Sequence, residues 1–468
     1  MIVAVALDLG TTSIKAGLLS AQGELNGVVA RDAPPVAIKA GCYESDAGAY
    51  AEAADRVLAE CLAQTDVLPP LGLCSQRSSF LLWERSSGRP LMPLISWQDD
   101  RGMASCEALR EKEWRIRALT GLPLTPYYLA PKLSVLLEQH PEWIAHLASG
   151  AWLLGTLDSF LIWRWTGGKH HVTDASMAAR TLLMDIHRVQ WSAELCELFG
   201  VDAGILPKIL PSAGWQIQLD NGLRLQASVA DQSAAMWQGI APGCGEALVN
   251  LGTGGFVAAF GSQGRLAGYL QTLVCQDAQQ QVHMACEGTL NSIAAALASY
   301  PVDSCLPEDL ASDDIYCVAE PSGLGAPYFR RDIGLRFSKS VEHLDSRRMA
   351  LLLQEGIIFR VARIIEDFRH ELDVKSVYLS GGLSNLPCVQ QGIASLVPVA
   401  YQISQSEAGL HGVAQLASGE SGGRIRRVQK LAASAAAARL RRKFEGWKLW
   451  LDELLESGAR GPGNRGTR

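Results

Sequence analysis

The chain lacks several features that mark particular classes of protein. Its 11 cysteines form an odd total with no Cys-X-X-Cys pair, which argues against a disulfide framework and a zinc site and suits a reducing compartment. No apolar run reaches the roughly 18 residues of a membrane span, and the first ten residues hold no basic segment of the kind that opens an export signal. We therefore expect a cytoplasmic protein with no membrane partner.

Basic charge is scarce over most of the chain. The sequence has 42 Lys and Arg against 48 Asp and Glu, a net charge of −6. Residues 421–468 hold 12 of the basic and 4 of the acidic residues, so this tail carries +8 and residues 1–420 carry −14. Because the body is acidic, we expect no nucleic-acid partner.

Apolar residues are abundant. They make up 48% of 468 residues, which argues against intrinsic disorder. A single core seldom exceeds roughly 250 to 300 residues, so the length predicts two or more domains.

A duplicated pattern also predicts two domains. Apolar strands Ile2–Leu7 and Ile14–Leu19 flank a Gly-Thr turn and predict a β-hairpin. Residues 247–260 repeat this order, with Asn250-Leu-Gly-Thr253 in place of Asp8-Leu-Gly-Thr11. Punctuation by Pro and Gly near residues 240–246 suggests the boundary. The predicted domains are 1–240 and 241–420, followed by a basic helical tail, 421–468.

Periodicity predicts the main helices. These are Tyr50–Cys61, Trp114–Thr120, Leu133–Gln139 and Met349–Phe368, with a strand at Ser376–Leu379. Residues 424–456 are predicted to be one long helix, and residues 457–468 to be disordered. The tail helix has an apolar stripe formed by Leu440, Phe444, Trp447, Leu451 and Leu454. We favour packing of this stripe on the protein body or on a second subunit over contact with a membrane or a partner.

Short Gly-Thr turns present backbone N–H groups and hydroxyls to anions. Two such hairpins could hold the phosphates of a nucleotide, and Asp8 beside the first could hold Mg²⁺, which takes oxygen ligands. The alternative is a pair of ordinary hairpins. After a strand, Ser380-Gly381-Gly382 lets a backbone approach a nucleoside, or is a simple strand-to-helix turn.

Polar residues within apolar surroundings suggest a substrate site. Asp231 could accept the proton of a substrate hydroxyl in phosphoryl transfer, or it could be a helix N-cap. Residues 76–78 (Gln-Arg-Ser) and 97–101 (Trp-Gln-Asp-Asp-Arg) combine donors, an aromatic ring and carboxylates, which suits a small polyhydroxy ligand. Surface salt bridges are the alternative for Asp99, Asp100 and Arg101.

In this order, the motifs resemble those of the FGGY family of carbohydrate kinases. The resemblance runs from residue 2 to about residue 420 and depends on the colinear set rather than on any one motif. The strongest matches are Leu7–Leu18, Ala230–Gln232, Gly252–Gly254 and Ser380–Gly382. The family implies an α/β fold with two actin/hexokinase-like (ribonuclease H-like) ATPase domains and an interdomain cleft.

The resemblance also implies roles for individual residues. Residues 1–240 would form the substrate and phosphate side, 241–420 the nucleotide side, and the ligands would be ATP, Mg²⁺ and a sugar or polyol. Asp231 would be the general base, with Asp8 and Asp231 near the metal. The nucleotide would contact Gly10, Thr11, Thr12, Lys15, Gly252, Thr253, Gly381, Gly382 and Asn385. The substrate would contact Gln76, Arg77, Ser78, Trp97, Tyr127, Asp231, Gln232 and Phe256.

Within the family the chain is most similar to the glycerol kinase branch. Gln76-Arg77, Trp97 and Tyr127 match that branch, whereas Ser78 stands where glycerol kinases carry Glu. A shorter side chain leaves room and removes a charge, so the resemblance leaves the substrate open. Lys15 replaces the usual Arg near the phosphates, and Val135 replaces a Trp.

Two other functions are left open. The chain could be a pentulose or hexulose kinase of the ribulokinase or xylulokinase type. It could also be a catalytically silent nucleotide-binding protein of the actin fold. The oligomeric state is open as well, with a homo-oligomer such as a dimer among the options.

Overall fold

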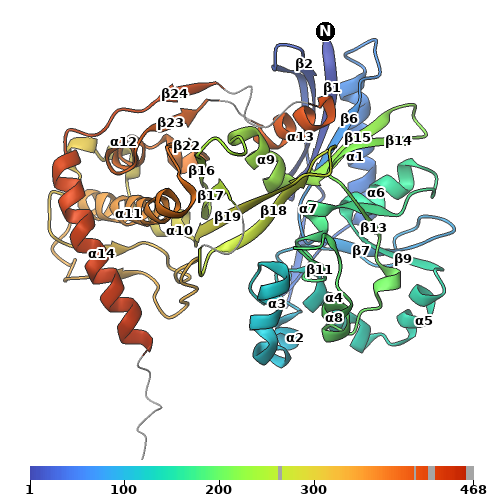
Figure 1. The fold of residues 1–468 in the computed structure, drawn as a ribbon, viewed down its shortest axis with the longest axis horizontal. Coiled ribbons are helices and arrows are strands. Elements are labelled where there is room, and N and C mark those ends of the chain that lie inside the picture. Colours follow the sequence, from blue (N-terminus) through green and yellow to red (C-terminus); the bar gives the residue numbers. More distant parts are fainter. Residues whose placement is uncertain (262–265, 405–406, 420–426, 460–468) are drawn as a thin grey trace, which may run out of the picture. The chain divides into compact units, whose positions relative to one another are not determined.

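The computed structural model describes residues 1–261, 266–404, 407–419 and 427–459, and it divides into two compact units (Figure 1). The first unit comprises residues 1–241, 271–284 and 406–425, and the second comprises 242–270, 285–405 and 426–468. Both units are therefore discontinuous in sequence. The divisions at 270/271 and 284/285 fall inside strands β18 (Leu270–Gln276) and β19 (Val282–Leu290).

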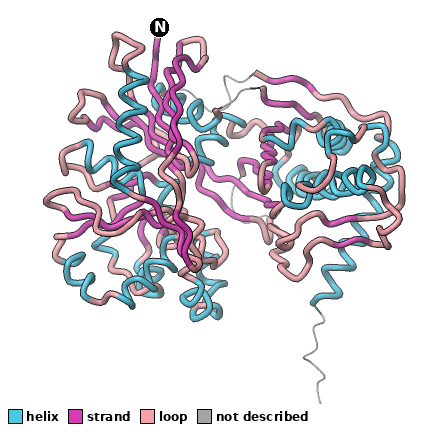
Figure 2. The backbone as a smooth tube through the Cα atoms, turned by 180° about the vertical axis from the view of Figure 1, so that it is seen from behind, coloured by secondary structure: helices cyan, strands magenta, loops and turns pink. Residues whose placement is uncertain are grey.

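A six-stranded sheet forms the centre of the first unit (magenta strands in Figure 2). Its order is β14-β15-β6-β1-β2-β3, in which β1 pairs antiparallel with β2 and parallel with β6, and β6 pairs parallel with β15. The strands are β1 (Ile2–Leu9), β2 (Ser13–Ser20), β3 (Leu25–Asp32), β6 (Leu71–Ser75), β14 (Ala213–Gln218) and β15 (Arg224–Ala230). The predicted N-terminal hairpin is confirmed.

Alternation along β1 assigns its side chains to two faces of this sheet. Val5, Leu7 and Leu9 join a hydrophobic core with residues of α1 (Ala47–Leu62). The alternate residues are small or polar, and α13 (Ala408–Ser418) contacts β1, β6 and β15. The close approach of α13 to β1 depends on glycine, since a Cβ at Gly409 would lie 2.9 Å from Asp8 Oδ2.

A second, five-stranded sheet of order β4-β5-β8-β7-β9 extends the first unit. Its strands are β4 (Ala37–Lys39), β5 (Cys42–Ser45), β7 (Phe80–Glu84), β8 (Leu94–Ile95) and β9 (Trp152–Thr156). Short pairs are formed by β10 (Val172–Asp174) with β13 (Lys208–Leu210) and by β11 (Met184–Asp185) with β12 (Gln190–Trp191).

The remaining helices of the first unit surround these sheets. They are α2 (Met103–Ala108), α3 (Glu113–Thr120), α4 (Leu129–Gln139), α5 (Glu142–Ala148), α6 (Leu157–Trp165), α7 (Ala175–Ala178), α8 (Ala193–Leu198) and α9 (Asp231–Gly239). The predicted helices at residues 50–61, 114–120 and 133–139 lie within α1, α3 and α4.

The second unit repeats the same strand pattern. Strand β16 (Glu246–Leu251) pairs antiparallel with β17 (Gly255–Phe260) and parallel with β22 (Ser376–Ser380), as β1 does with β2 and β6. The full order is β18-β19-β17-β16-β22-β23-β24, with β23 (Ala400–Ile403) and β24 (Val428–Lys430). The duplicated hairpin expected from the sequence is therefore confirmed.

The other elements of the second unit complete a single large core. They are α10 (Ile293–Leu297), α11 (Ser346–Leu372), α12 (Pro387–Leu396), α14 (Ala437–Ala459) and the strand pair β20 (Cys317–Val318) and β21 (Arg336–Phe337). Asp345 caps α11 by accepting a hydrogen bond from the Arg348 backbone N–H at 2.8 Å. In the described part of the chain no helix is long and apolar enough to cross a membrane.

The prediction of one helix over residues 424–456 is wrong. Residues 424–426 lie outside the described residues, 428–430 form β24, and the helix begins only at Ala437. Pairing of β24 with the edge strand β23 outweighs local helix propensity there. At the other end α14 continues to Ala459, so the expected disorder fails for residues 457–459, and residues 460–468 lie outside the described residues.

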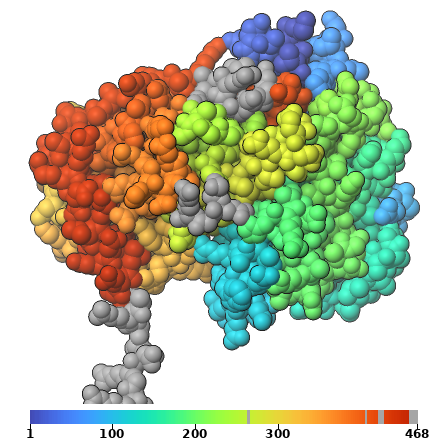
Figure 3. Space-filling model, in the orientation of Figure 1, coloured from blue at the N-terminus to red at the C-terminus, as the bar shows by residue number. Residues whose placement is uncertain are grey.

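The apolar stripe of α14 packs on the protein body, as favoured from the sequence. Leu440, Phe444, Trp447 and Leu451 are buried in the second unit's core, and Leu454 packs against it. Lys443 donates to Glu355 at 2.5 Å and to Asp313 at 2.7 Å, and Lys448 donates to Glu366 at 2.8 Å. In Figure 3 the red surface of α14 lies directly against the orange surface of the preceding helices. Part of the basic tail is therefore paired within its own unit.

Candidate active site

Three parallel strands of the first unit end at the same edge of their sheet. Asp231 follows β15, Gln76 follows β6, and Gly10 follows β1. The carboxyl ends of parallel strands are the usual ligand-binding edge of α/β sheets. The fold therefore gathers most of the predicted substrate and phosphate residues in one unit.

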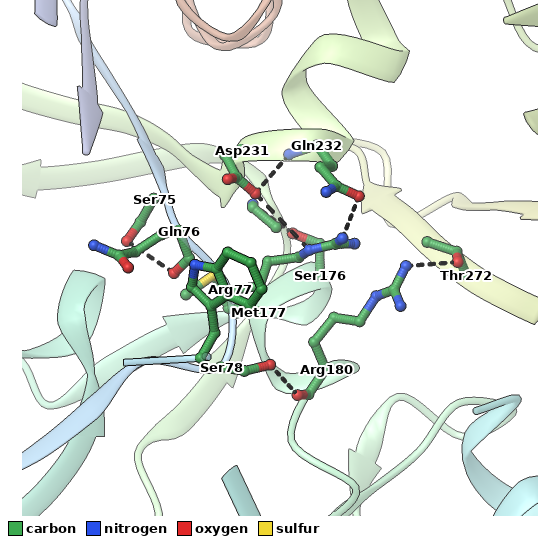
Figure 4. A network of polar contacts seen from close by, with 12 residues as sticks. Ser75, Gln76, Arg77, Ser78, Ser176, Met177, Arg180, Asp231, Gln232 and Thr272 are labelled. Carbon is green, nitrogen blue, oxygen red and sulfur yellow. Dashed lines mark hydrogen bonds and ion pairs between the residues drawn. The ribbon is translucent and has the colours of Figure 1, made fainter. Parts of the chain in front are cut away.

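Asp231 is the first residue of α9 and lies beside an arginine (Figure 4). The N-cap of this helix is Ala230, so the alternative reading of Asp231 as an N-cap is wrong. Its Oδ1 accepts a hydrogen bond from the Gln232 backbone at 2.7 Å and lies 3.8 Å from Arg77 Nε. Arg77 also donates to the Gln232 side chain. Burial raises the pKa of Asp231 above its ordinary value, and the Arg77 charge opposes this rise.

A hydrogen-bonded aromatic wall lies next to the first Gly-Thr turn. The Trp97 indole donates to Thr11 Oγ1 at 2.9 Å, and Thr11 donates to Gln76 Oε1 at 3.2 Å. The Trp97 and Tyr127 rings lie 5.3 Å apart between centroids. These four predicted residues are therefore brought together.

Ser78 is buried, and its hydroxyl is already engaged. Its Oγ donates to the Arg180 carbonyl oxygen at 3.0 Å, and its φ is 63° (Figure 4). A left-handed backbone is uncommon for a residue other than glycine, so this conformation is held by its surroundings. No carboxylate stands at this position.

Two residues that support the candidate site, Tyr50 and Lys132, were not assigned a role from the sequence. The Tyr50 hydroxyl donates to the Gly10 carbonyl oxygen at 2.6 Å. Lys132 is fully buried and donates to the carbonyl oxygens of Ser78, Ser96 and Tyr127 at 3.3, 2.9 and 3.0 Å. Lys132 thus ties together three loops of the site. Lys132 begins the Lys-X-X-Val segment in which Val135 replaces the Trp of the family signature, and this was a visible signal. Tyr50 lies on a helix with nothing in the sequence to mark it.

Asp99 and Arg101 form a structural ion pair. Arg101 Nε lies 2.7 Å from Asp99 Oδ1, and its Nη2 lies 2.6 Å from Glu44 Oε1. The hydrogen bonds from Arg101 and from the Tyr43 backbone hold the pKa of Asp99 below its usual value against the effect of burial. These residues support the loop that carries Trp97. Because Asp99 is buried, the pair is not the surface salt bridge of the alternative expectation, and Asp100 is exposed.

Asp8 is the predicted magnesium ligand. Among the described residues, its Oδ1 is a buried oxygen without a hydrogen-bond partner. Burial and then the negative charge of Asp231 raise the pKa of Asp8 to about 7. No group of three or more His, Cys, Asp or Glu side chains suited to a metal occurs in the described part of the chain. One or two carboxylates fit Mg²⁺, which keeps several waters and phosphate oxygens as ligands.

Lys15 forms an ion pair next to this carboxylate. Its Nζ donates to Oε1 and Oε2 of Glu407 at 3.0 and 2.7 Å. Thr12, the other predicted phosphate contact, is exposed at the turn. Lys15, which is predicted to contact the phosphates, is therefore paired with a carboxylate.

The predicted nucleotide residues of the second unit also gather at strand ends. Gly252 and Thr253 form the turn between β16 and β17, and Gly381 follows β22. A Cβ at Gly381 would lie 2.4 Å from the Leu251 carbonyl oxygen, so only glycine permits this approach at its φ of 87°. Gly382 and Asn385 begin and end the following 3-10 turn. Phe256, predicted to contact substrate, lies on β17 in this unit.

Comparisons with known proteins cover nearly the whole chain. The sequence model for the N-terminal domain of the FGGY family of carbohydrate kinases matches residues 3–227, and that for the C-terminal domain matches residues 228–419. A glycerol kinase of Thermus brockianus is 34% identical over 385 residues, which is 77% of each chain.

Solved structures share the fold. A glycerol kinase of Plasmodium falciparum with ADP superposes with a TM-score of 0.84 at 21% identity, covering 96% of this chain and 98% of that one. A xylulose kinase of Rhodospirillum rubrum gives 0.82 at 18% identity, covering 97% and 99%. These similarities confirm the two-domain, actin/hexokinase-like α/β fold expected from the sequence.

Proposed function

Because this chain belongs to the FGGY family of carbohydrate kinases, we propose that it transfers the γ-phosphoryl group of ATP to a hydroxyl group of a small polyol. The observation that carries the proposal is Asp231, which lies beside Arg77 at the strand edge that also bears Thr11 and Gln76; the Trp97 indole donates to Thr11 there. Phosphoryl transfer requires chiefly positioning and charge neutralisation, which these residues can supply. The glycerol kinase of Thermus brockianus supports a polyol, whereas the xylulose kinase neighbour keeps a pentulose as the alternative.

In the proposed mechanism Asp231 accepts the proton of the attacking hydroxyl. The raised pKa of Asp231 makes it a stronger base than an ordinary carboxylate, and the Arg77 guanidinium, 3.8 Å away, orients it. Trp97 and Tyr127 pack on the carbon skeleton of the substrate, and Gln76, Arg77 and Gln232 bind its hydroxyls. Gly10, Thr11, Thr12, Lys15, Gly252 and Thr253 would contact the phosphates, and Gly381, Gly382 and Asn385 the nucleoside.

Asp8, with Asp231 nearby, would hold Mg²⁺ in this site. When bound, the metal neutralises charge on the phosphate oxygens. Asp8→Asn is expected to raise the Mg²⁺ concentration that half-saturates the enzyme by about tenfold or more, because a charged oxygen ligand is lost. Titration of activity with Mg²⁺, and of bound Mn²⁺ by electron paramagnetic resonance, measures this. Asp220→Asn, at an exposed carboxylate outside the candidate site, is the control. An unchanged metal requirement in Asp8→Asn would exclude Asp8 as a ligand.

The identity of the polyol is tested by a coupled ADP-release screen. Glycerol, erythritol, ribitol, xylulose, ribulose and fructose cover the polyol and ketose alternatives. We expect the highest kcat/KM with a polyol. A ketose as the best acceptor would favour the pentulose or hexulose kinase alternative, and absence of turnover with all of them would contradict the proposed substrate class.

Ser78 is the residue from which we infer a substrate other than glycerol. Its hydroxyl proton is donated to the Arg180 carbonyl oxygen, so the position provides neither a charge nor a free donor. Sites that hydrogen-bond a substrate hydroxyl discriminate strongly between ligands that have it and ligands that lack it. A bulkier or differently substituted acceptor would fill the space that a longer side chain occupies in glycerol kinases.

Ser78→Glu is therefore expected to improve use of glycerol. A carboxylate at this position would accept hydrogen bonds from glycerol hydroxyls, and we expect kcat/KM for glycerol to rise by about tenfold relative to the best acceptor of the native enzyme. Ser78→Gln, of equal length and without charge, is the matched variant. If both variants lose glycerol turnover while remaining folded, Ser78 does not determine specificity in this way.

A further inference from the structure

Near its end, just before Asp231, strand β15 is hydrogen-bonded by a loop carbonyl and a side-chain hydroxyl instead of by β14. Strand β14 pairs with β15 only as far as Ala227. Beyond that point, the Ser228 N–H donates to the Ser212 carbonyl oxygen at 3.0 Å, and the Ala230 N–H donates to Ser176 Oγ at 2.8 Å. Alternate residues of a strand direct their N–H groups to the same side. These two bonds therefore continue the ladder to the residue that precedes Asp231.

One buried carboxylate, that of Asp174, accepts hydrogen bonds from both of the serines that supply these acceptors. Asp174 Oδ2 accepts hydrogen bonds from the Ser176 backbone N–H at 2.8 Å and from Ser212 Oγ at 2.7 Å. Its Oδ1 accepts from the Met177 N–H at 2.9 Å. Asp174 is fully buried, and these bonds go to backbone and hydroxyl groups rather than to a cation. A buried carboxylate is costly unless it is paired or hydrogen-bonded, so these three bonds hold Asp174 in place.

Capping of α7 explains only part of this arrangement. Asp174 caps that helix through Ser176 and Met177, but the helix has only four residues. The bond from Ala230 to Ser176 Oγ, and that from Ser212 Oγ to Asp174, lie outside the cap. The first bond ends at Ala230, the last residue of β15, and the second holds Ser212, whose carbonyl oxygen accepts from Ser228 of β15. Helix α9 begins at the next residue, Asp231. Figure 4 shows Ser176 and Met177 directly beside Asp231 and Arg77.

We propose that Asp174, acting through Ser176 and Ser212, is the positioning group for Asp231. None of the three is assigned a contact with substrate. They fix the backbone at Ser228 and Ala230, and thereby the start of α9 and the direction of the Asp231 carboxylate. This inference rests on the proposed role of Asp231 as the general base. Its functional consequence is that a displaced base costs turnover, because misplacement by about 1 Å can slow a reaction by about a hundredfold.

The chain offers a matched pair of serines for the test. Ser176→Ala removes the acceptor of the Ala230 N–H. Ser228→Ala removes an equally buried hydroxyl, on the same strand two residues before Ala230, that has no hydrogen-bond partner among the described residues. With the best acceptor of the screen above, we expect kcat to fall about 10- to 100-fold in Ser176→Ala, with the KM for ATP within about twofold of the native value. Ser228→Ala is expected to keep the native kcat.

Two further variants at position 176 keep the test decisive if the alanine variant does not fold. Ser176→Thr retains a hydroxyl acceptor and is expected to recover most of kcat, whereas Ser176→Cys is similar in size with a weak acceptor and is expected to lose it. Hydrogen exchange of the peptide around Ala230 supplies a readout independent of substrate. Exchange is expected to accelerate in Ser176→Ala or Ser176→Cys and to stay unchanged in Ser228→Ala.

The outcomes separate this inference from the function on which it rests. Native kcat and native exchange in Ser176→Ala, together with an inactive Asp231→Asn, would overturn the positioning role and leave the base in place. An active Asp231→Asn would overturn the base itself. If kcat falls by the same factor in Ser228→Ala, the loss in Ser176→Ala is explained by disturbed core packing, and the positioning role is overturned as well.

Discussion

Asp231→Asn is expected to abolish phosphoryl transfer while ATP still binds. The amide keeps the shape of the side chain, but it cannot accept the proton of the attacking hydroxyl. General bases contribute about 10²- to 10⁴-fold to a rate, so kcat should fall by that factor. The ion pair to Arg77 would also be lost, leaving a buried guanidinium with its bond to Gln232. Steady-state ADP release gives kcat, and isothermal titration calorimetry gives the affinity for ATP.

The control for this variant is Asp220→Asn. Asp220 is an exposed carboxylate of the same unit, outside the candidate site, and its loss should leave kcat unchanged. Turnover in Asp231→Asn near the native value would exclude Asp231 as the base. Loss of ATP binding together with turnover would assign Asp231 to nucleotide or metal binding instead.

Trp447→Ala is expected to cause the largest loss of stability. Trp447 is fully buried in the core of the second unit, its indole donates to the Cys317 carbonyl oxygen at 2.7 Å, and its ring lies 5.6 Å from that of Phe359. Truncation of a buried aromatic residue leaves a cavity and here also removes a hydrogen bond, a cost of about 3–5 kcal/mol. Chemical denaturation followed by circular dichroism measures the free energy of unfolding.

The same helix carries a matched control. Leu449 is 68% exposed, so Leu449→Ala should change the free energy of unfolding by less than about 0.5 kcal/mol. Equal stability of the Trp447 and Leu449 variants would mean that α14 does not contribute to the core.

Local patterns predicted the elements that local forces determine. The Gly-Thr hairpins and the helices of strong periodicity were placed correctly, because alternation and 3.6-residue spacing reflect burial of one face. The start of the tail helix was wrong, because β24 forms by pairing with β23, a partner that adjacent residues do not reveal.

The candidate site divides in a similar way. The residues that belong to recognisable motifs are brought together in one unit of the structure. They are Asp231, Arg77, Gln76, Trp97 and Thr11. The groups that hold those residues were not found from the sequence. Their function consists of hydrogen bonds to backbone atoms distant along the chain, as for Lys132 and the Tyr50 hydroxyl, and such bonds leave little trace in a motif.

Helix α14 lies outside the segment that the family models match, yet it belongs to the folded core of the second unit. The family match ends at residue 419, yet the core of the second unit includes side chains up to Leu451. A fragment trimmed to the matched segment would expose the wall that Trp447 covers and leave Glu355 without its lysine. Such a fragment would be expected to aggregate during expression, and shortened versions of this kinase should therefore retain the chain through α14.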